Sequence, residues 1–260
     1  MNFFIKHFAL HPVVARLYRN AGILFTGNIS SSLLGLVSLA ILTRALSLEV
    51  FAVYTLVIAL VHILDRLTSF QTWQALIHFG SHALEQNDKT LLTSLFLFGW
   101  LLDIVSGLAG FGLAITITTW LPSLFGLHEE ALLPVAIAAS VLLFNWLSSS
   151  TAIMRLFNRY YAQAIYQNIT AILLLILFTL LWLSDTTNLT PYLLAFAISR
   201  ITGQLIFAGL SIRESVKQGL WSAPQINLKR MFHKSPRLWR FVFTTNVDVG
   251  SFSRICVAVM

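Results

Sequence analysis

Six long apolar stretches, each close to the length of a membrane-spanning helix, restrict the fold of this 260-residue chain more than any other feature. An α-helix rises about 1.5 Å per residue, so about 20 mainly apolar residues cross a hydrocarbon core about 30 Å thick. The stretches are residues 22–42, 51–73, 91–121, 131–153, 164–183 and 192–212. They are too long for membrane β-strands and lack strict apolar–polar alternation. The sequence therefore predicts an all-α, polytopic membrane protein.

The composition agrees with this class. Hydrophobic residues make up 57% of the chain and charged residues 10%, whereas a soluble domain has about 25% charged residues. The net charge of +7 would raise nucleic acid as a partner of a soluble chain, but we expect none here. Cys256 is the single cysteine, and the seven histidines form no His-Glu-x-x-His motif. We therefore expect no metal site, no cofactor and no catalytic residues.

Lysine and arginine in short loops concentrate on the cytoplasmic side of membrane proteins. The loops on the N-terminal side of the predicted membrane carry thirteen, namely Lys6, Arg16, Arg19, Lys89, Arg155, Arg159, Arg213, Lys217, Lys229, Arg230, Lys234, Arg237 and Arg240. The opposite loops carry Arg44 alone. This imbalance predicts a cytoplasmic N-terminus. The basic loop 213–240 could also form a phospholipid or nucleic-acid patch, but we interpret it as the orientation signal and a solvated connector.

Four regions follow from this pattern: an amphipathic cytoplasmic segment (1–20), a six-helix bundle (21–212), the basic loop (213–240) and the start of a seventh span (241–260). The residues Phe, Thr and Asn near the start of the first span, at Phe25 to Asn28, recur near the start of the seventh, at Phe243 to Asn246. Such an echo is typical of two parallel six-helix halves in a transporter. We therefore expect a truncated copy of a two-bundle protein: a fragment, a frameshift product or a half-transporter that works as a homodimer. Alone, it is not expected to transport.

Three segments carry a resemblance to a known family: residues 42–46 with 51–54, residues 70–77, and residues 239–246. The first is similar to the hairpin motif Leu-Thr-Arg-x-Leu, followed by Phe-Gly-x-Tyr, of the polysaccharide flippases in the multidrug/oligosaccharidyl-lipid/polysaccharide exporter superfamily. Two departures are Ala52, where that family has Gly, and residues 247–260, where the pattern is lost.

The resemblance implies the first half of a MATE-like transporter, in which two six-helix bundles form a V around a central cavity. It implies translocation of a polyprenyl-diphosphate-linked oligosaccharide across the inner membrane of a bacterium for lipopolysaccharide, capsule or exopolysaccharide biosynthesis. Membrane lipids and the polysaccharide polymerase and assembly machinery are the implied partners.

Charged residues inside predicted spans are costly and therefore mark candidate sites. They are Asp65, Arg66, Asp103, Arg200, Asp248 and Arg254. Arg66 and Arg200 would bind the diphosphate, because a guanidinium is permanently charged and forked for phosphate oxygens. Asp103 and Asp65 would carry a coupling ion. The alternative is that the pairs Asp103–Arg200 and Asp65–Arg66 neutralise each other inside the bundle.

Uncharged polar residues add further candidates for the substrate. Trp73 and Gln74 could stack on and hydrogen-bond a sugar, although Trp near the end of a span is also a common interface anchor. Asn28 is a candidate because an amide in the first turns of a span is uncommon.

Other functions remain open. A drug or cation antiporter of the same superfamily would favour an acidic cavity, whereas here two aspartates are matched by two arginines. A membrane-embedded glycosyltransferase or acyltransferase would need a catalytic motif at a membrane face. The nearest candidate is His128-Glu129-Glu130, in an otherwise featureless loop, so we do not expect an enzyme.

Overall fold

The computed structural model describes residues 12–69, 72–120 and 131–220, with side chains from residue 18 onward. All regular structure in these ranges is helical, which confirms the predicted all-α class. The helices are α2 (Pro12–Ala45), α3 (Leu48–Thr68), α4 (Trp73–Glu85), α5 (Lys89–Trp120), α6 (Leu132–Leu143), α7 (Leu147–Leu156), α8 (Tyr161–Leu183) and α9 (Leu189–Lys217). The predicted seventh span, with Asp248 and Arg254, lies outside the described residues.

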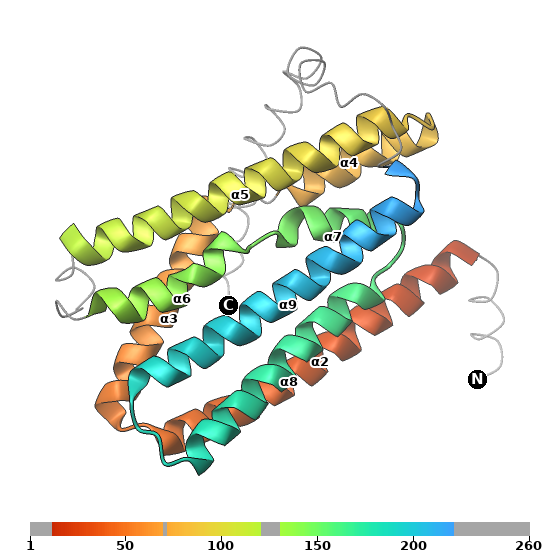
Figure 1. Ribbon diagram of the computed structural model, residues 1–260. Helices are drawn as coiled ribbons and strands as arrows, with labels where there is room; N and C mark the ends of the chain where they lie inside the picture. The colour runs from red at the N-terminus through yellow and green to blue at the C-terminus, as the bar shows by residue number, and fades with distance from the viewer. Residues whose placement is uncertain (1–11, 70–71, 121–130, 221–260) are drawn as a thin grey trace, which may run out of the picture.

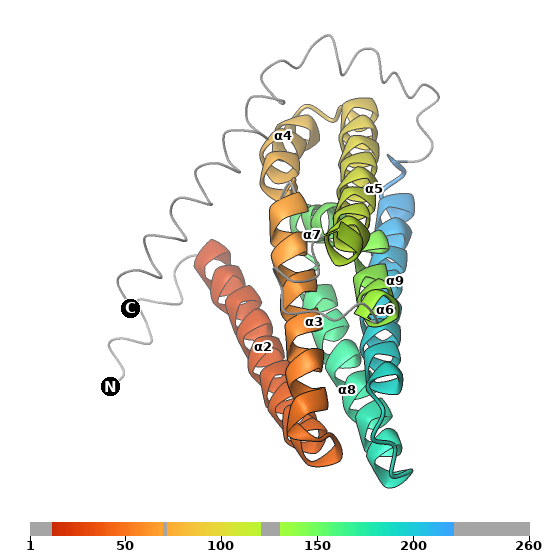
Figure 2. The same ribbon diagram turned by 90° about the vertical axis from the view of Figure 1, so that its left-hand side faces the viewer.

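In the part of the chain that the structure describes, six spans are long and apolar enough to cross a membrane, as predicted. Figure 1 shows α5, the α6–α7 pair, α9 and α8 running side by side, with α2 against α8. Figure 2 shows α2 and α3 meeting at one end and separating towards the other. Because α2 is attached mainly through α8, its apolar side chains Phe25, Leu33 and Leu36 stay exposed.

The α2–α8 contact depends on a close approach of the two backbones. A Cβ on Gly27 would lie 2.6 Å from the Cβ of Ala164, so a larger residue does not fit there. Asn168 of α8 donates a hydrogen bond to the Gly27 carbonyl at 3.4 Å and accepts one from the Ser30 hydroxyl. Gly27 thus allows the close helix packing that small residues make possible in membranes, whereas Gly35 of the same helix has open space around it.

The main core is built from α3, α5, α6, α8 and α9, together with the end of α2. Tyr192 and Phe178 are almost fully buried at its centre, with ring centroids 5.5 Å apart in an edge-on arrangement. Tyr54 of α3 adds a third ring, 6.3 Å from Phe178. This aromatic cluster joins the first two turns of α3 and the start of α9 to the last two turns of α8.

Two of the six predicted stretches are interrupted. The second, predicted to run to Trp73, ends as a helix at Thr68, and Trp73 instead begins α4. The fourth is broken between Leu143 and Leu147. There the last turn of α6 tightens to i→i−3 bonds, because the Phe144 and Asn145 amides donate to the Val141 and Leu142 carbonyls at 3.2 and 3.1 Å.

Candidate functional site

The two helix breaks meet around a polar cavity of about 270 Å³. This volume is near the lower end of the roughly 300–1,000 Å³ that is usual for small-molecule sites. The lining residues are Asp65, Ser69, Trp73, Asp103, Ser106, Asn145, Leu147, Ser148, Thr151, Arg155 and Gln163. Irregular backbone at membrane depth is tolerated where it lines such a cavity.

Ser148 joins the two breaks. Its hydroxyl accepts a hydrogen bond from the Trp73 backbone N–H at 3.0 Å and shares another with the Thr72 hydroxyl at 2.9 Å. The first turn of α7 is thereby tied to the first turn of α4. The Trp73 backbone N–H has no partner within α4, and α4 has no side-chain N-cap. The Ser148 hydroxyl satisfies this donor instead.

Asp103 of α5 faces the start of α7. Its carboxylate accepts the Ser149 backbone N–H at 2.9 Å and the Thr72 hydroxyl at 3.5 Å, and the residue is only 7% exposed. The N-terminus of a helix carries a partial positive charge, which favours a carboxylate at this place.

Glycines on either side of Asp103 bring α5 close enough for this contact. A Cβ on Gly107 would overlap the Leu142 carbonyl oxygen, and one on Gly99 would lie 2.7 Å from the Ser149 hydroxyl oxygen. With one of these glycines four residues before Asp103 and the other four after it, all three lie on one face of the helix.

Asp65 lies in the last turn of α3 and is half-buried. Asn145, in the α6–α7 break, donates its side-chain amide to the Asp65 carboxylate. His62, Arg200 and Arg66 lie within electrostatic range of the same carboxylate. The Asp65 carboxylate therefore has a neutral donor from one break and positively charged residues of α3 and α9 around it.

Arg155 lies in the last turn of α7 and faces the cavity. Its guanidinium carbon is 4.5 Å from the centroid of the Trp73 ring, which is within cation–π range. Its Nη2 donates to the Gln163 side-chain oxygen at 3.4 Å. The Arg155 Nε is buried and has no hydrogen-bond partner among the described residues.

The structure brings together three of the seven predicted site residues. Asp65, Trp73 and Asp103 line the cavity. The others lie elsewhere: Asn28 and Arg66 are exposed, Gln74 is half-buried outside the lining, and Arg200 has its guanidinium carbon 5.6 Å from the Phe196 ring centroid.

Neither of the alternative ion pairs, Asp103–Arg200 or Asp65–Arg66, forms within the described residues. Both carboxylates are instead satisfied mainly by uncharged donors.

Sequence reasoning missed several cavity residues. Arg155 was counted as a charge of the loop that follows, although it lies inside the helix. Asn145 and the run Ser148-Ser149-Ser150-Thr151 interrupt an otherwise apolar stretch. That interruption was the available signal for a break in the helix.

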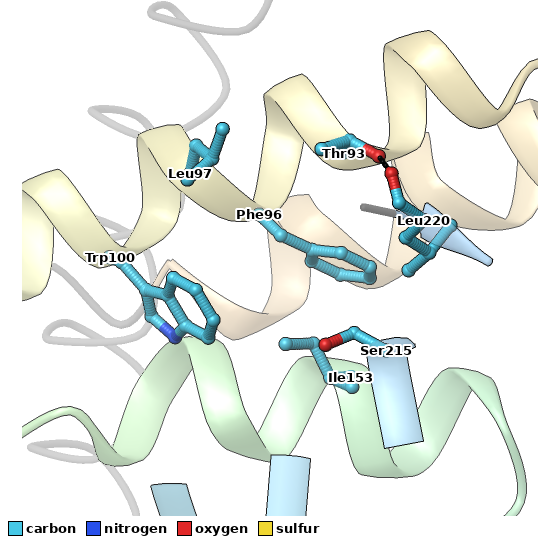
Figure 3. A pocket seen from close by; sticks show the side chains of 7 residues that line it. All are labelled: Thr93, Phe96, Leu97, Trp100, Ile153, Ser215 and Leu220. Carbon is cyan, nitrogen blue, oxygen red and sulfur yellow. Dashed lines mark hydrogen bonds between the residues drawn. The ribbon is translucent and has the colours of Figure 1, made fainter. Parts of the chain in front are cut away.

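A second hollow is much smaller. It measures about 10 Å³, room for about one water, and lies between α5, α7 and the end of α9 (Figure 3). Its walls are mostly apolar, and the Thr93 hydroxyl closes it by donating to the Leu220 carbonyl at 2.7 Å. It is too small to hold a substrate. Across the described ranges, no three His, Cys, Asp or Glu side chains gather in a way that could hold a metal ion.

The fold and the cavity together define a multi-pass helical membrane protein with a polar site inside the bundle. The chain belongs to the polysaccharide biosynthesis protein family, whose pattern it matches over residues 17–255. It is similar to the inner membrane protein YghQ of Escherichia coli (strain K12), with 25% identity over 260 residues. The match covers 99% of this chain and 73% of that relative. No solved structure matches the chain.

Proposed function

We propose that this protein is a flippase that moves a polyprenyl-diphosphate-linked saccharide across the inner membrane for polysaccharide biosynthesis. The observation that supports this most is a polar cavity with charged walls inside the membrane bundle of a polysaccharide biosynthesis protein. A sugar diphosphate cannot cross hydrocarbon without such polar partners, because an unpaired charge there is costly.

The cavity favours loading from the side predicted to be cytoplasmic. Arg155 and Gln163 lie in the last turn of α7 and the first turn of α8, next to the connection that we expect in the cytoplasm. Lipid-linked saccharides would be presented there before they cross. Asp103 and Asp65 remain our candidates for the coupling ion, and Arg66, Arg200, Gln74 and Asn28 remain candidates for later contacts along the path.

The test is a leaflet assay. The purified chain is reconstituted into liposomes that contain a fluorescent polyprenyl-diphosphate saccharide, and a membrane-impermeant reductant bleaches the label in the outer leaflet. A flippase makes the protected inner-leaflet label accessible, whereas a chain without this activity gives the same bleached fraction as empty liposomes. Because transporter sites lie between two halves, a chain that acts as a homodimer would show a rate rising with the square of protein density when density is low.

A second candidate is a drug or cation antiporter. The sequence predicts that two arginines, Arg66 and Arg200, balance the charges of two aspartates in the cavity. Asp65 and Asp103 both line the cavity, but neither of these arginines does. Uptake of a lipophilic cation into the same liposomes under an imposed proton gradient tests this function. Cation uptake without saccharide movement would favour the antiporter over the flippase.

A further inference from the structure

We infer that the cavity is a two-ended subsite that holds the phosphate of a phosphorylated sugar at Arg155 and its hydroxyl groups at Asp103, Asp65 and Asn145. The identity of the lipid-linked ligand rests on the proposed function. The geometry of the subsite is independent of that function, because it follows from which polar groups of the cavity are already paired.

The basic end lacks a partner for its charge. Arg155 forms no ion pair with a described carboxylate, and its contacts are the Trp73 ring and a single long hydrogen bond to Gln163. A buried guanidinium N–H left unpaired costs free energy. A phosphate oxygen is the acceptor that matches its charge and its planar, forked donors.

At the acidic end, both carboxylates already accept hydrogen bonds from the protein, but each has lone pairs left over for further donors. A carboxylate offers about four lone-pair positions. Asp103 uses two, for Ser149 and Thr72, and Asp65 receives one hydrogen bond, from Asn145. Hydroxyl groups of a sugar are donors that fill the remaining positions without adding charge.

The spacing of the two ends suits one phosphorylated sugar. Ser149, which binds Asp103, and Arg155 are six residues apart on α7, which is about 9 Å along the axis at 1.5 Å per residue. This distance keeps the phosphate away from the carboxylates. Arg200 and Arg66, both within electrostatic range of Asp65, further offset the negative charge of that end. The volume of about 270 Å³ admits a small polar ligand rather than a long oligosaccharide.

The test measures binding to the full chain in nanodiscs of uncharged phosphatidylcholine, by calorimetry. Glucose 1-phosphate, glycerol 1-phosphate and inorganic phosphate are compared, since phospholipid headgroups and free phosphate offer the same anion. We expect glucose 1-phosphate to bind most tightly, because only it reaches both ends. Equal affinity for all three ligands would overturn the claim that Asp103, Asp65 and Asn145 bind sugar hydroxyls. If none of the ligands bound to the wild-type chain, the whole subsite would be overturned.

Variants assign the phosphate to its residue. Arg155→Gln should weaken glucose 1-phosphate binding on the order of tenfold to a hundredfold, as expected for losing a hydrogen bond to a charged group. Arg155→Lys should keep part of the affinity, because it retains a point charge. Arg213→Gln, at an exposed position outside the cavity, is the matched control and should bind like the wild type. Wild-type affinity in Arg155→Gln would overturn the assignment.

A measurement on the unaltered chain guards against a variant that does not fold. Phenylglyoxal modifies arginine side chains, and mass spectrometry gives the rate at each position. Glucose 1-phosphate should slow the modification of Arg155 and leave that of Arg213 unchanged; equal rates with and without ligand count against the site.

The subsite and the proposed function fail in different ways. Binding of glucose 1-phosphate without lipid movement in the leaflet assay would reject the flippase and keep the subsite. Lipid movement by the wild-type chain, together with unchanged binding in Arg155→Gln, would keep the flippase and reject the subsite.

Discussion

The carboxylate of Asp103 caps the α7 half-helix by accepting the Ser149 backbone N–H at 2.9 Å. Through this contact, α5 holds the break between α6 and α7 in place, and the cavity exists because the break does. Ser149 is fully buried, so its N–H has little access to water as an alternative acceptor.

The first prediction concerns this cap. Asp103→Ala should lower the free energy of unfolding by about 2–3 kcal/mol, because it leaves the buried Ser149 N–H without an acceptor, while Asp103→Asn should cost about 1 kcal/mol. Thermal unfolding in detergent micelles measures both. Asp185→Asn changes an exposed carboxylate and should stay within about 0.5 kcal/mol of the wild type. Equal stability of Asp103→Ala and Asp185→Asn would contradict the cap.

The second prediction concerns the close approach of α5 to α6. Gly107→Ala should destabilise the bundle by about 1–3 kcal/mol, because the new methyl group would overlap the Leu142 carbonyl. Gly112→Ala, in the same helix with open space around it, should be neutral or stabilise by up to about 1 kcal/mol. Chemical unfolding of the two variants side by side measures the difference, and a Gly107→Ala as stable as Gly112→Ala would show that the helices lie further apart.

The third prediction concerns an ion pair beside the α7–α8 connection. The Arg159 Nε donates to the Glu214 carboxylate at 3.2 Å, and Gln218 donates to the same oxygen at 3.0 Å. A double-mutant cycle with Arg159→Gln and Glu214→Gln should give a coupling free energy of about 1 kcal/mol, since one partner is buried and the other is partly exposed. The coupling should shrink at high salt. Strictly additive effects of the two substitutions would mean that the pair contributes nothing.

The fourth prediction tests the α2–α8 packing. In a Cys256→Ser background, Ser30→Cys with Asn168→Cys should form a disulfide under mild oxidation, because the two native side chains are hydrogen-bonded. Ser32→Cys with Asn168→Cys should not, since Ser32 is exposed and points about 200° around the helix from Ser30. The shift of the intact chain on a non-reducing gel distinguishes the two. Cross-linking of the control pair alone would require a different register for α2.

The fifth prediction tests the orientation, which is inferred from charge alone. In the same cysteine-free background, Thr187→Cys in the exposed α8–α9 loop should react with a membrane-impermeant maleimide on whole spheroplasts. Gln86→Cys, exposed at the end of α4, should react only after the membrane is opened. The opposite pattern would place the N-terminus and the Arg155 end of the cavity on the outside.

Neighbouring residues show how far sequence reasoning reaches into the site. Trp73 and Gln74 are both sequence candidates, but only Trp73 lines the cavity, because successive residues of a helix point about 100° apart. Arg66 lies inside a predicted span and is therefore a sequence candidate, whereas Arg155 lies just beyond the predicted span 131–153 and is not. In the structure Arg66 is exposed, and Arg155 faces the cavity.

The sequence by itself determined the class of the protein and its six spans. Continuous hydrophobicity over about 20 residues is a local property, and in hydrocarbon only a helix satisfies its own backbone. Only the tertiary structure decided which polar residues meet. That outcome depends on where α3 and α6 end, and on how closely Gly99 lets α5 approach α7 and Gly107 lets it approach α6. Asp103, Asp65 and Arg155 come from three different helices, so their common cavity arises from packing between spans rather than from the pattern along any one of them.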